Sequence, residues 1–400
     1  MPEFVKRIRI FACRGLFKAL KGRDLRSLTA SVLNITAASL VAGGMVWMIA
    51  HFSEPRYQGK SLRVWLDEAG GNGEIAAFYL GDDQPATSSA RAVRAIGTDA
   101  IPILIGMART RESGLRKMLV KLSRKHAWIS IHARDFLGLH YEAAYGFGLL
   151  GPSAKAAVPD LIALLDDDDP EVRCYAAMGL GNIGRASAEA VPDLRRYLEF
   201  VVQDKPGTRW DWEAEYAISA LGEIGPAARP ALAQITAFTN TGSYATEVAA
   251  RAALIQISGS GLDTAVEPLK DTSHLRNWCD ACEIVSRLGT NGAPAISLLL
   301  ADLQQTNEDI QMSVIQALGR IHTHPDQCIP AMTPFLRSTN GAARFYSLLA
   351  ISAFGSSAGQ WAPTSEIVHC LTDSDDEVRA MATNALRRVA AEAATKASVK

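Results

Sequence analysis

The stretch Asp168–Gly184 reads DDPEVRCYAAMGLGNIG and decides the fold of this chain. Asp169 can cap the free amides at the start of a helix, and Pro170 suits the first helical position. Glu171 carries the charge that the positive end of a helix dipole favours. The stretch therefore predicts a helix that begins at Pro170 and ends at the turn made by Gly184.

The same pattern returns along most of the chain. Aligning equivalent turns gives spacings of 54, 33, 41, 33, 31, 33, 36 and 32 residues between Gly97, Gly151, Gly184, Gly225, Ser258, Gly289, His322, Ala358 and Ala390. The residue four positions before each turn is apolar in all nine cases. The residue one position before the turn is Ile, Leu or Val in eight cases, and Ser357 is the exception. These positions share one face of a helix with the mostly small residues eight before the turn. The period therefore predicts stacked helices with a continuous apolar stripe.

A second helix is expected after most turns, because a proline follows each of the first eight by 5, 8 or 10 residues. The pattern D-x-x-E-V-R-x-x-A-x-x-x-L-x-x-I-G resembles the HEAT and HEAT-like repeats over about residues 88–392. The resemblance implies an all-α, right-handed α-solenoid of about nine two-helix units. It also implies partner binding more often than catalysis.

The residues before the array have a different character. Residues 1–27 carry eight basic and two acidic side chains, or +6, and the 23 residues Leu28–Ala50 contain no ionisable group. As a helix the latter would be roughly 34 Å long, enough to cross a bilayer. A buried helix of a soluble domain and a cleaved signal peptide are the alternatives. We expect a signal anchor with a cytoplasmic N-terminus and the repeats on the periplasmic or extracytoplasmic side.

Residues 51–87 are expected to form a juxtamembrane segment and a first helix leading into the array, and residues 393–400 a short tail. The stretch Glu54–Leu62, continuing to Trp65 and Leu66, resembles the juxtamembrane part of bacterial proteins that have one N-terminal anchor and a HEAT array. The resemblance implies the same order of anchor, short connection and repeats in this chain.

Length and charge agree with an array of units. A chain of 400 residues exceeds what one compact core usually serves, and six cysteines are too few for a disulfide scaffold. The net charge of -1 resolves into +6 in the leader, +7 in residues 109–134 and -14 elsewhere. The spacing of 54 residues between Gly97 and Gly151 is about 20 residues longer than the usual period. Residues 109–134, with their charge of +7, account for this insertion.

Two interruptions of the repeat are candidate interaction sites. Within the basic insertion, at about residues 109–134, we expect an amphipathic helix over Gly114–Trp128 whose basic residues are Arg116, Lys117, Lys121, Arg124 and Lys125. It could dock on anionic lipid headgroups or an acidic partner. Alternatively, its basic face could simply be solvated, or it could neutralise acidic repeat edges such as Asp166–Asp169. The 41-residue spacing contains Arg209, Trp210 and Trp212, which could anchor an interface, although Trp212 could equally pack inward.

Short motifs for catalysis do not fit their positions. Trp278-Cys279-Asp280-Ala281-Cys282 resembles the W-C-x-x-C of the thioredoxin active site, but here no strand precedes it, and the cysteines are expected to be small core residues. Gly355-Ser356-Ser357-Ala358-Gly359 falls on a turn between helices rather than on a nucleophile elbow. Gly59-Lys60-Ser61 lacks the first glycine of a P-loop.

The histidines do not assemble a metal site by sequence. His322 and His324 share one turn with no third ligand nearby, and no His-Glu pair is present. We therefore predict a membrane-tethered scaffold that binds a protein partner, with no catalytic residues, no cofactor, no metal and no nucleic acid. The alternative is a HEAT-like enzyme or a chromophore-handling protein of the lyase type.

Overall fold

A computed structural model describes residues 54–71, 75, 78, 87–111, 136–203 and 211–397. The chain divides into two compact units, Met1–Pro55 and Arg56–Lys400, and the second contains the helices and strands of the described residues. The leader, the anchor predicted at residues 28–50 and the five basic residues of the insertion lie outside the described residues. Those predictions therefore stay predictions.

The repeat in the sequence becomes a series of paired helices. The first helix of each unit is one of α5 (Ser88–Ile96), α8 (Phe136–Leu150), α10 (Pro170–Ile183), α12 (Asp211–Ile224), α14 (Tyr244–Ser258), α16 (Leu275–Arg287), α18 (Glu308–Ile321), α20 (Gly341–Ala353) and α22 (Asp376–Ala397). The second helices are α6 (Ile101–Ala108), α9 (Val158–Leu164), α11 (Val191–Gln203), α13 (Leu232–Thr236), α15 (Leu262–Val266), α17 (Ile296–Asp302), α19 (Pro325–Met332) and α21 (Thr364–Cys370).

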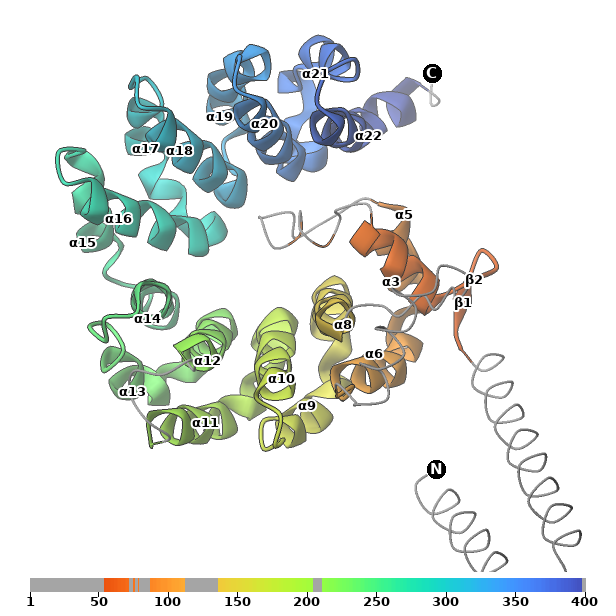
Figure 1. The fold of residues 1–400 in the computed structure, drawn as a ribbon, viewed down its shortest axis with the longest axis vertical. Helices are drawn as coiled ribbons and strands as arrows, with labels where there is room; N and C mark the ends of the chain where they lie inside the picture. The colour runs from red at the N-terminus through yellow and green to blue at the C-terminus, as the bar shows by residue number, and fades with distance from the viewer. Residues whose placement is uncertain are drawn as a thin grey trace, which may run out of the picture. The chain divides into compact units, whose positions relative to one another are not determined.

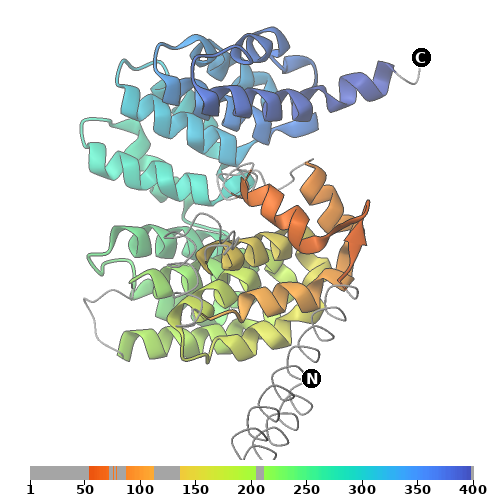
Figure 2. The ribbon, with the colours of Figure 1, turned by 45° about the vertical axis from the view of Figure 1, so that its right-hand side comes forward.

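Short 3-10 turns join or extend these helices: η1 (Gly97–Ala100), η2 (Gly151–Ala157), η3 (Gly184–Ala190), η4 (Gly225–Ala231), η5 (Glu267–Lys270), η6 (Gly289–Ala295), η7 (Thr333–Arg337) and η8 (Gly355–Trp361). Consecutive first helices lie side by side in one layer, and the second helices form a second layer against them (Figures 1 and 2). The stacked helices predicted from the period, and the all-α solenoid that the HEAT resemblance implied, are the architecture observed.

A small hairpin precedes the helices and was not predicted. Strands β1 (Arg56–Tyr57) and β2 (Lys60–Ser61) pair antiparallel, and α3 (Leu62–Gly71) follows directly. The turn between the strands is made by Gln58 and Gly59, which both have positive φ, at 48° and 80°. Next to it, Lys60 pairs with Glu68 at 2.6 Å, so this stretch is a structural turn and not a phosphate loop.

The predicted helix start at Pro170 is confirmed. The Asp169 carboxylate accepts a hydrogen bond from the Glu171 amide at 3.0 Å, as a capping residue does. Asp375 accepts one from the Glu377 amide at 2.8 Å. Prolines stand at the second position of the second helices α6, α9 and α11. The local signals in the sequence therefore set where these helices begin.

The apolar stripe is the core. Seven of the nine residues four positions before the aligned turns are buried, and Leu254 and Leu386 are half-buried. Burial of each such side chain removes apolar surface from water and stabilises the stack by roughly 1.5–3 kcal/mol. The stripe of each first helix faces its own second helix and the neighbouring units.

Three predicted turns were displaced or absent. At the fifth, the residue with positive φ is Gly259, at 71°, one residue past Ser258. The turn of the eighth unit is Gly355, with φ 49°, and not Ala358. With Gly355 as the reference, the preceding residue is buried Phe354, and the exception at Ser357 disappears. The turn predicted at Ala390 does not form, because α22 continues from Asp376 to Ala397.

One helical stretch of the described residues, Gly138–Leu164, is long and apolar enough to cross a membrane. It is not one straight helix, because Gly151 has φ 50° and η2 separates α8 from α9. Its apolar side chains, such as Phe147 and Leu161, are buried among those of neighbouring helices. Length and composition alone are therefore weak evidence for a membrane role of this stretch.

Candidate interaction groove

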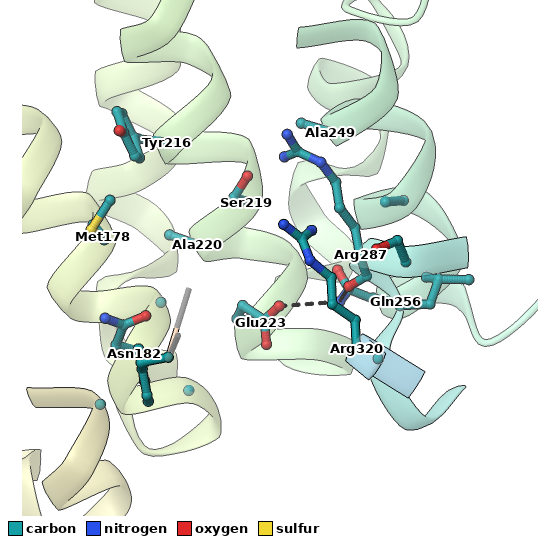
Figure 3. A pocket seen from close by; sticks show the side chains of 18 of the residues that line it. Met178, Asn182, Tyr216, Ser219, Ala220, Glu223, Ala249, Gln256, Arg287 and Arg320 are labelled. Atoms are coloured by element: carbon teal, nitrogen blue, oxygen red, sulfur yellow. Dashed lines mark hydrogen bonds between the residues drawn. The ribbon is translucent and has the colours of Figure 1, made fainter. Parts of the chain in front are cut away.

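A groove of about 800 Å³ opens on the side of the array formed by the first helices (Figure 3). Six consecutive first helices, α8 to α18, contribute to its lining. The lining combines small residues with aromatic, sulfur-containing and hydrogen-bonding side chains. Its principal side chains are Phe78, Tyr141, Met178, Asn182, Tyr216, Ser219, Glu223, Gln256, Arg287 and Arg320.

Glycines three residues before the turns let several first helices approach closely. A Cβ added to Gly181 would lie 3.0 Å from Ala220 Cα, and one added to Gly319 would lie 2.8 Å from Ala350 Cα. At Gly319 the helices would have to move apart to admit a Cβ, and at Gly181 the neighbouring helix would have to give by a few tenths of an ångström. The constant distance of these glycines from the turn is visible in the sequence, but the predicted pattern did not include it.

Arg287 ties two helices that are not neighbours. Its Nη2 donates to Glu215 Oε1 of α12 at 2.8 Å, and its Nε donates to Glu283 Oε1 of its own helix at 3.0 Å. Ala249 and Ala252 of the intervening α14 line the same groove and are small enough to leave this path open. Burial opposes the charge of Arg287, but the hydrogen bond to Glu215 and the charge of that carboxylate raise the pKa above the usual value.

Arg320 stands beside Arg287 with weaker compensation. The shortest ion pair of its guanidinium with a described residue is to Glu283 Oε1, at 3.8 Å, beyond hydrogen-bond distance. Its side chain is only 24% exposed. Burial lowers the pKa of Arg320 from its usual value, and the charge of Arg287 lowers it further despite Glu283.

Amide side chains add hydrogen-bonding capacity to the groove. Gln256 Nε2 donates to Glu223 Oε1 at 3.3 Å and to the Arg287 carbonyl at 3.2 Å (Figure 3). Asn182 Nδ2 donates to the Ala144 carbonyl at 2.8 Å. These contacts hold the amides in place, so the groove presents fixed polar groups rather than mobile ones.

Only one of the eight predicted interaction residues is described. Trp212 is half-buried at the start of α12 and meets Tyr216 edge to face, with ring centroids 6.3 Å apart. Tyr216 lines the groove, so Trp212 supports a groove residue from beside it. Arg209, Trp210 and the basic residues Arg116, Lys117, Lys121, Arg124 and Lys125 lie outside the described residues, and their roles stay predictions.

The first residues of the basic insertion pair with acidic groups of the next unit. Arg109 contacts Asp160 at 2.5 Å, and Arg111 contacts Asp167 at 2.7 Å. The hydrogen bond and charge of Asp167 raise the pKa of Arg111. These two pairs place positive charge beside acidic groups at the edge of the next unit, whereas the interpretation of the helix at 114–128 stays a prediction.

The cysteine pair has the surroundings of core residues. Cys282 is buried in α16, and burial raises the pKa of both its thiol and that of Cys279. The adjacent Trp278 is fully buried and donates from Nε1 to Asp302 Oδ2 at 2.7 Å. A redox thiol needs a lowered pKa, so these directions oppose a thioredoxin-like role.

The remaining motifs are also structural. Ser357 lies in η8 and its hydroxyl donates to the Phe354 carbonyl at 2.6 Å, as expected for a turn between helices. His322 and His324 both have positive φ in the turn before α19. Over the residues that the structure describes, no three His, Cys, Asp or Glu side chains gather as a metal site would require.

Comparison with known proteins agrees with this architecture. Residues 139–210, which contain α8 to α11, match the family model for HEAT repeats. This part of the chain therefore consists of HEAT-like repeats. No curated protein sequence matches it.

Solved structures give a more distant likeness. The complex of CpcE and CpcF of phycocyanin lyase from Nostoc sp. PCC7120 is 19% identical, with a TM-score of 0.33, and the match covers 72% of this chain and 94% of that one. An engineered protein is 17% identical with a TM-score of 0.31, covering 58% of this chain and 98% of its own. TM-scores this far below 0.5 do not define a common overall arrangement, so only the family-model match over residues 139–210 supports the HEAT-like assignment.

Proposed function

We propose that this protein is a membrane-tethered HEAT-repeat scaffold that holds a segment of a protein partner in the groove of the first helices. The observation that carries the proposal is the groove itself, in which six consecutive first helices place aromatic, amide and charged side chains around small residues. A site lined by several stacked units suits a long partner segment, because each unit adds contacts along one direction. Tyr216 and Arg287 are of the residue types that dominate interface energetics.

Tethering is the second part of the proposal. The uncharged stretch Leu28–Ala50 would anchor the chain, and the +6 leader before it would keep the N-terminus in the cytoplasm. Deleting residues 28–50 should move the protein from the membrane fraction to the soluble fraction. Retention of the deleted chain on alkali-washed membranes would contradict the anchor while leaving the groove untouched.

Site-specific photocrosslinking tests the groove. A photoreactive residue at Ser219, which lines the groove, should crosslink a partner in native membranes, whereas one at the exposed Glu189 of η3 should not. Ser219→Trp should block the groove and abolish capture from a second photoreactive residue at Met178, and Glu189→Trp is the matched control. Crosslinks from Glu189 alone, or capture that survives Ser219→Trp, would place the partner elsewhere.

The alternative of a HEAT-like enzyme or chromophore-handling protein stays a prediction. The same purified protein tests it, because a chromophore-handling protein would carry or transfer a coloured group. A visible absorption band that disappears in Ser219→Trp would favour that alternative over a protein partner.

A further inference from the structure

Arg320 differs from three other arginines that have little exposed surface. Arg173, Arg287 and Arg344 each donate at least two hydrogen bonds, and each reaches a carboxylate oxygen within 3.0 Å. Arg320 donates none to a described residue, and its nearest described carboxylate oxygen is 3.8 Å away. A guanidinium has five N–H donors in a fixed fork, so the described residues leave most of its bonding capacity unused.

The unused donors of Arg320 are accessible from the groove. Its side chain is mostly buried. Its nitrogens are nevertheless not among the described polar atoms that are both fully buried and without a hydrogen-bond partner, so they can be reached from outside. The residue lines the groove, and Figure 3 shows its guanidinium beside that of Arg287. Glu283, the described carboxylate near it, already accepts from Arg287 at 3.0 Å.

We propose that Arg320 binds a carboxylate of the partner, from an aspartate or glutamate side chain of the segment held in the groove. The inference rests on the proposed function and names the chemistry of its occupant. A carboxylate matches the two parallel N–H groups of a guanidinium, and the pair is strong where water is excluded. Arg287 lies alongside but is held by Glu215 and Glu283, so Arg320 makes the direct contact.

The surrounding charges oppose a doubly charged group more strongly than a singly charged one. Glu215 and Glu223 line the same groove, and Glu283 lies next to both arginines. A phosphate group with its additional charge would be repelled by three glutamates, whereas a carboxylate adds one charge opposite the least compensated cation. The occupant is therefore an acidic protein segment rather than a phosphorylated one.

Selection from a library of random dodecapeptides displayed on phage, using the full-length protein in nanodiscs, tests the inference. We expect the selected peptides to share Asp or Glu at one fixed position. Arg320→Gln should lose that preference and bind the best peptide about tenfold more weakly or worse. Arg196→Gln, which removes the same charge from the exposed side of α11, is the matched control and should keep both preference and affinity.

A double-mutant cycle separates a direct contact from a general charge effect. Replacing the acidic peptide residue by Gln should weaken binding to the wild-type chain but not to Arg320→Gln. An unchanged melting temperature for Arg320→Gln would show that the variant is folded. If the Gln-substituted peptide lost the same affinity for the wild-type chain and for Arg320→Gln, the proposed contact would be wrong.

The outcomes distinguish this inference from the proposed function. Selected peptides without an acidic preference, whose binding Ser219→Trp still blocks, would leave the groove as the binding site and overturn the carboxylate contact. Failure to select any peptide, together with no crosslink from Ser219, would overturn both.

Discussion

Two neighbouring interfaces of the array, α12–α14 and α14–α16, are built differently. At the first, Gly222 stands three residues before the turn, and a Cβ there would lie 3.1 Å from Ala253 Cα of the next helix. At the second, the equivalent residues are Ile255 and Ile284, which pack in one small cluster. Two isoleucines therefore meet at the α14–α16 interface, where a glycine meets an alanine at the α12–α14 interface. Because isoleucine is larger, α14 and α16 pack less closely than α12 and α14.

The difference divides the core. One hydrophobic cluster runs from Leu62 to Ile257, and another begins at Leu269. Between them lies the small cluster around Val248, Ile284 and Leu288. In a stacked array each unit is stabilised mainly by its neighbours, so a thin interface is where opening costs least. The groove crosses this junction, and Arg287 spans it to reach Glu215.

The largest effect is expected where the close packing of first helices also contains a buried ion pair. Arg173 donates to Glu213 Oε1 at 2.9 and 2.7 Å across α10–α12, and Tyr197 donates to the same oxygen at 2.6 Å. Glu213→Ala leaves the guanidinium buried without its carboxylate and should lower the free energy of unfolding by about 3–5 kcal/mol. Urea unfolding followed by circular dichroism measures it.

The control for this prediction is Glu199→Ala on the exposed side of α11, which should cost about 0.5 kcal/mol or less. A cost for Glu213→Ala no greater than that of Glu199→Ala would show that the close interface does not depend on the ion pair.

An intermediate effect is expected at the junction. Ile284 is 3% exposed, and Ile284→Ala should cost about 2–4 kcal/mol through lost apolar contact and the remaining cavity. Amide hydrogen exchange should accelerate mainly in α14 and α16, because the cluster belongs to those helices. Val368→Ala, at a 47% exposed position, is the control that should change neither quantity. Faster exchange spread evenly over all units would contradict a local junction.

The smallest effect is expected from one added methyl group. Gly319→Ala places a Cβ 2.8 Å from Ala350 Cα and Cβ, so α18 and α20 must move apart, at a cost of about 1–3 kcal/mol. Gly106→Ala in α6 meets nothing within 4 Å and should instead gain about 0.5–1 kcal/mol through helix propensity. Thermal unfolding of both variants measures the contrast. Equal stabilisation would mean that close approach does not limit this interface.

The sequence predicted the fold well because its signals are local. Capping by Asp169, prolines at the starts of second helices and the apolar stripe each depend on residues within a few positions of one another. The error at Ala358 arose where a glycine three residues earlier makes the turn, and the error at Ala390 arose where α22 simply continues.

The candidate site was largely beyond prediction from sequence. Of the predicted interaction residues, Trp212 alone is described, and it supports the groove from beside it. The groove residues Gln256, Arg287 and Arg320 carry no motif, because ordinary surface helices contain the same residue types. Only their position on consecutive first helices makes them a site.

By itself, the sequence determined the helices, their order and the face that each one buries, because those properties follow from capping, periodicity and apolar burial within single units. Tertiary structure alone decided the pairing of Arg287 with Glu215, which are 72 residues apart, and the incomplete pairing of Arg320. Both depend on how closely α12, α14, α16 and α18 stack. That distance is set by which small or branched side chain meets which across each interface.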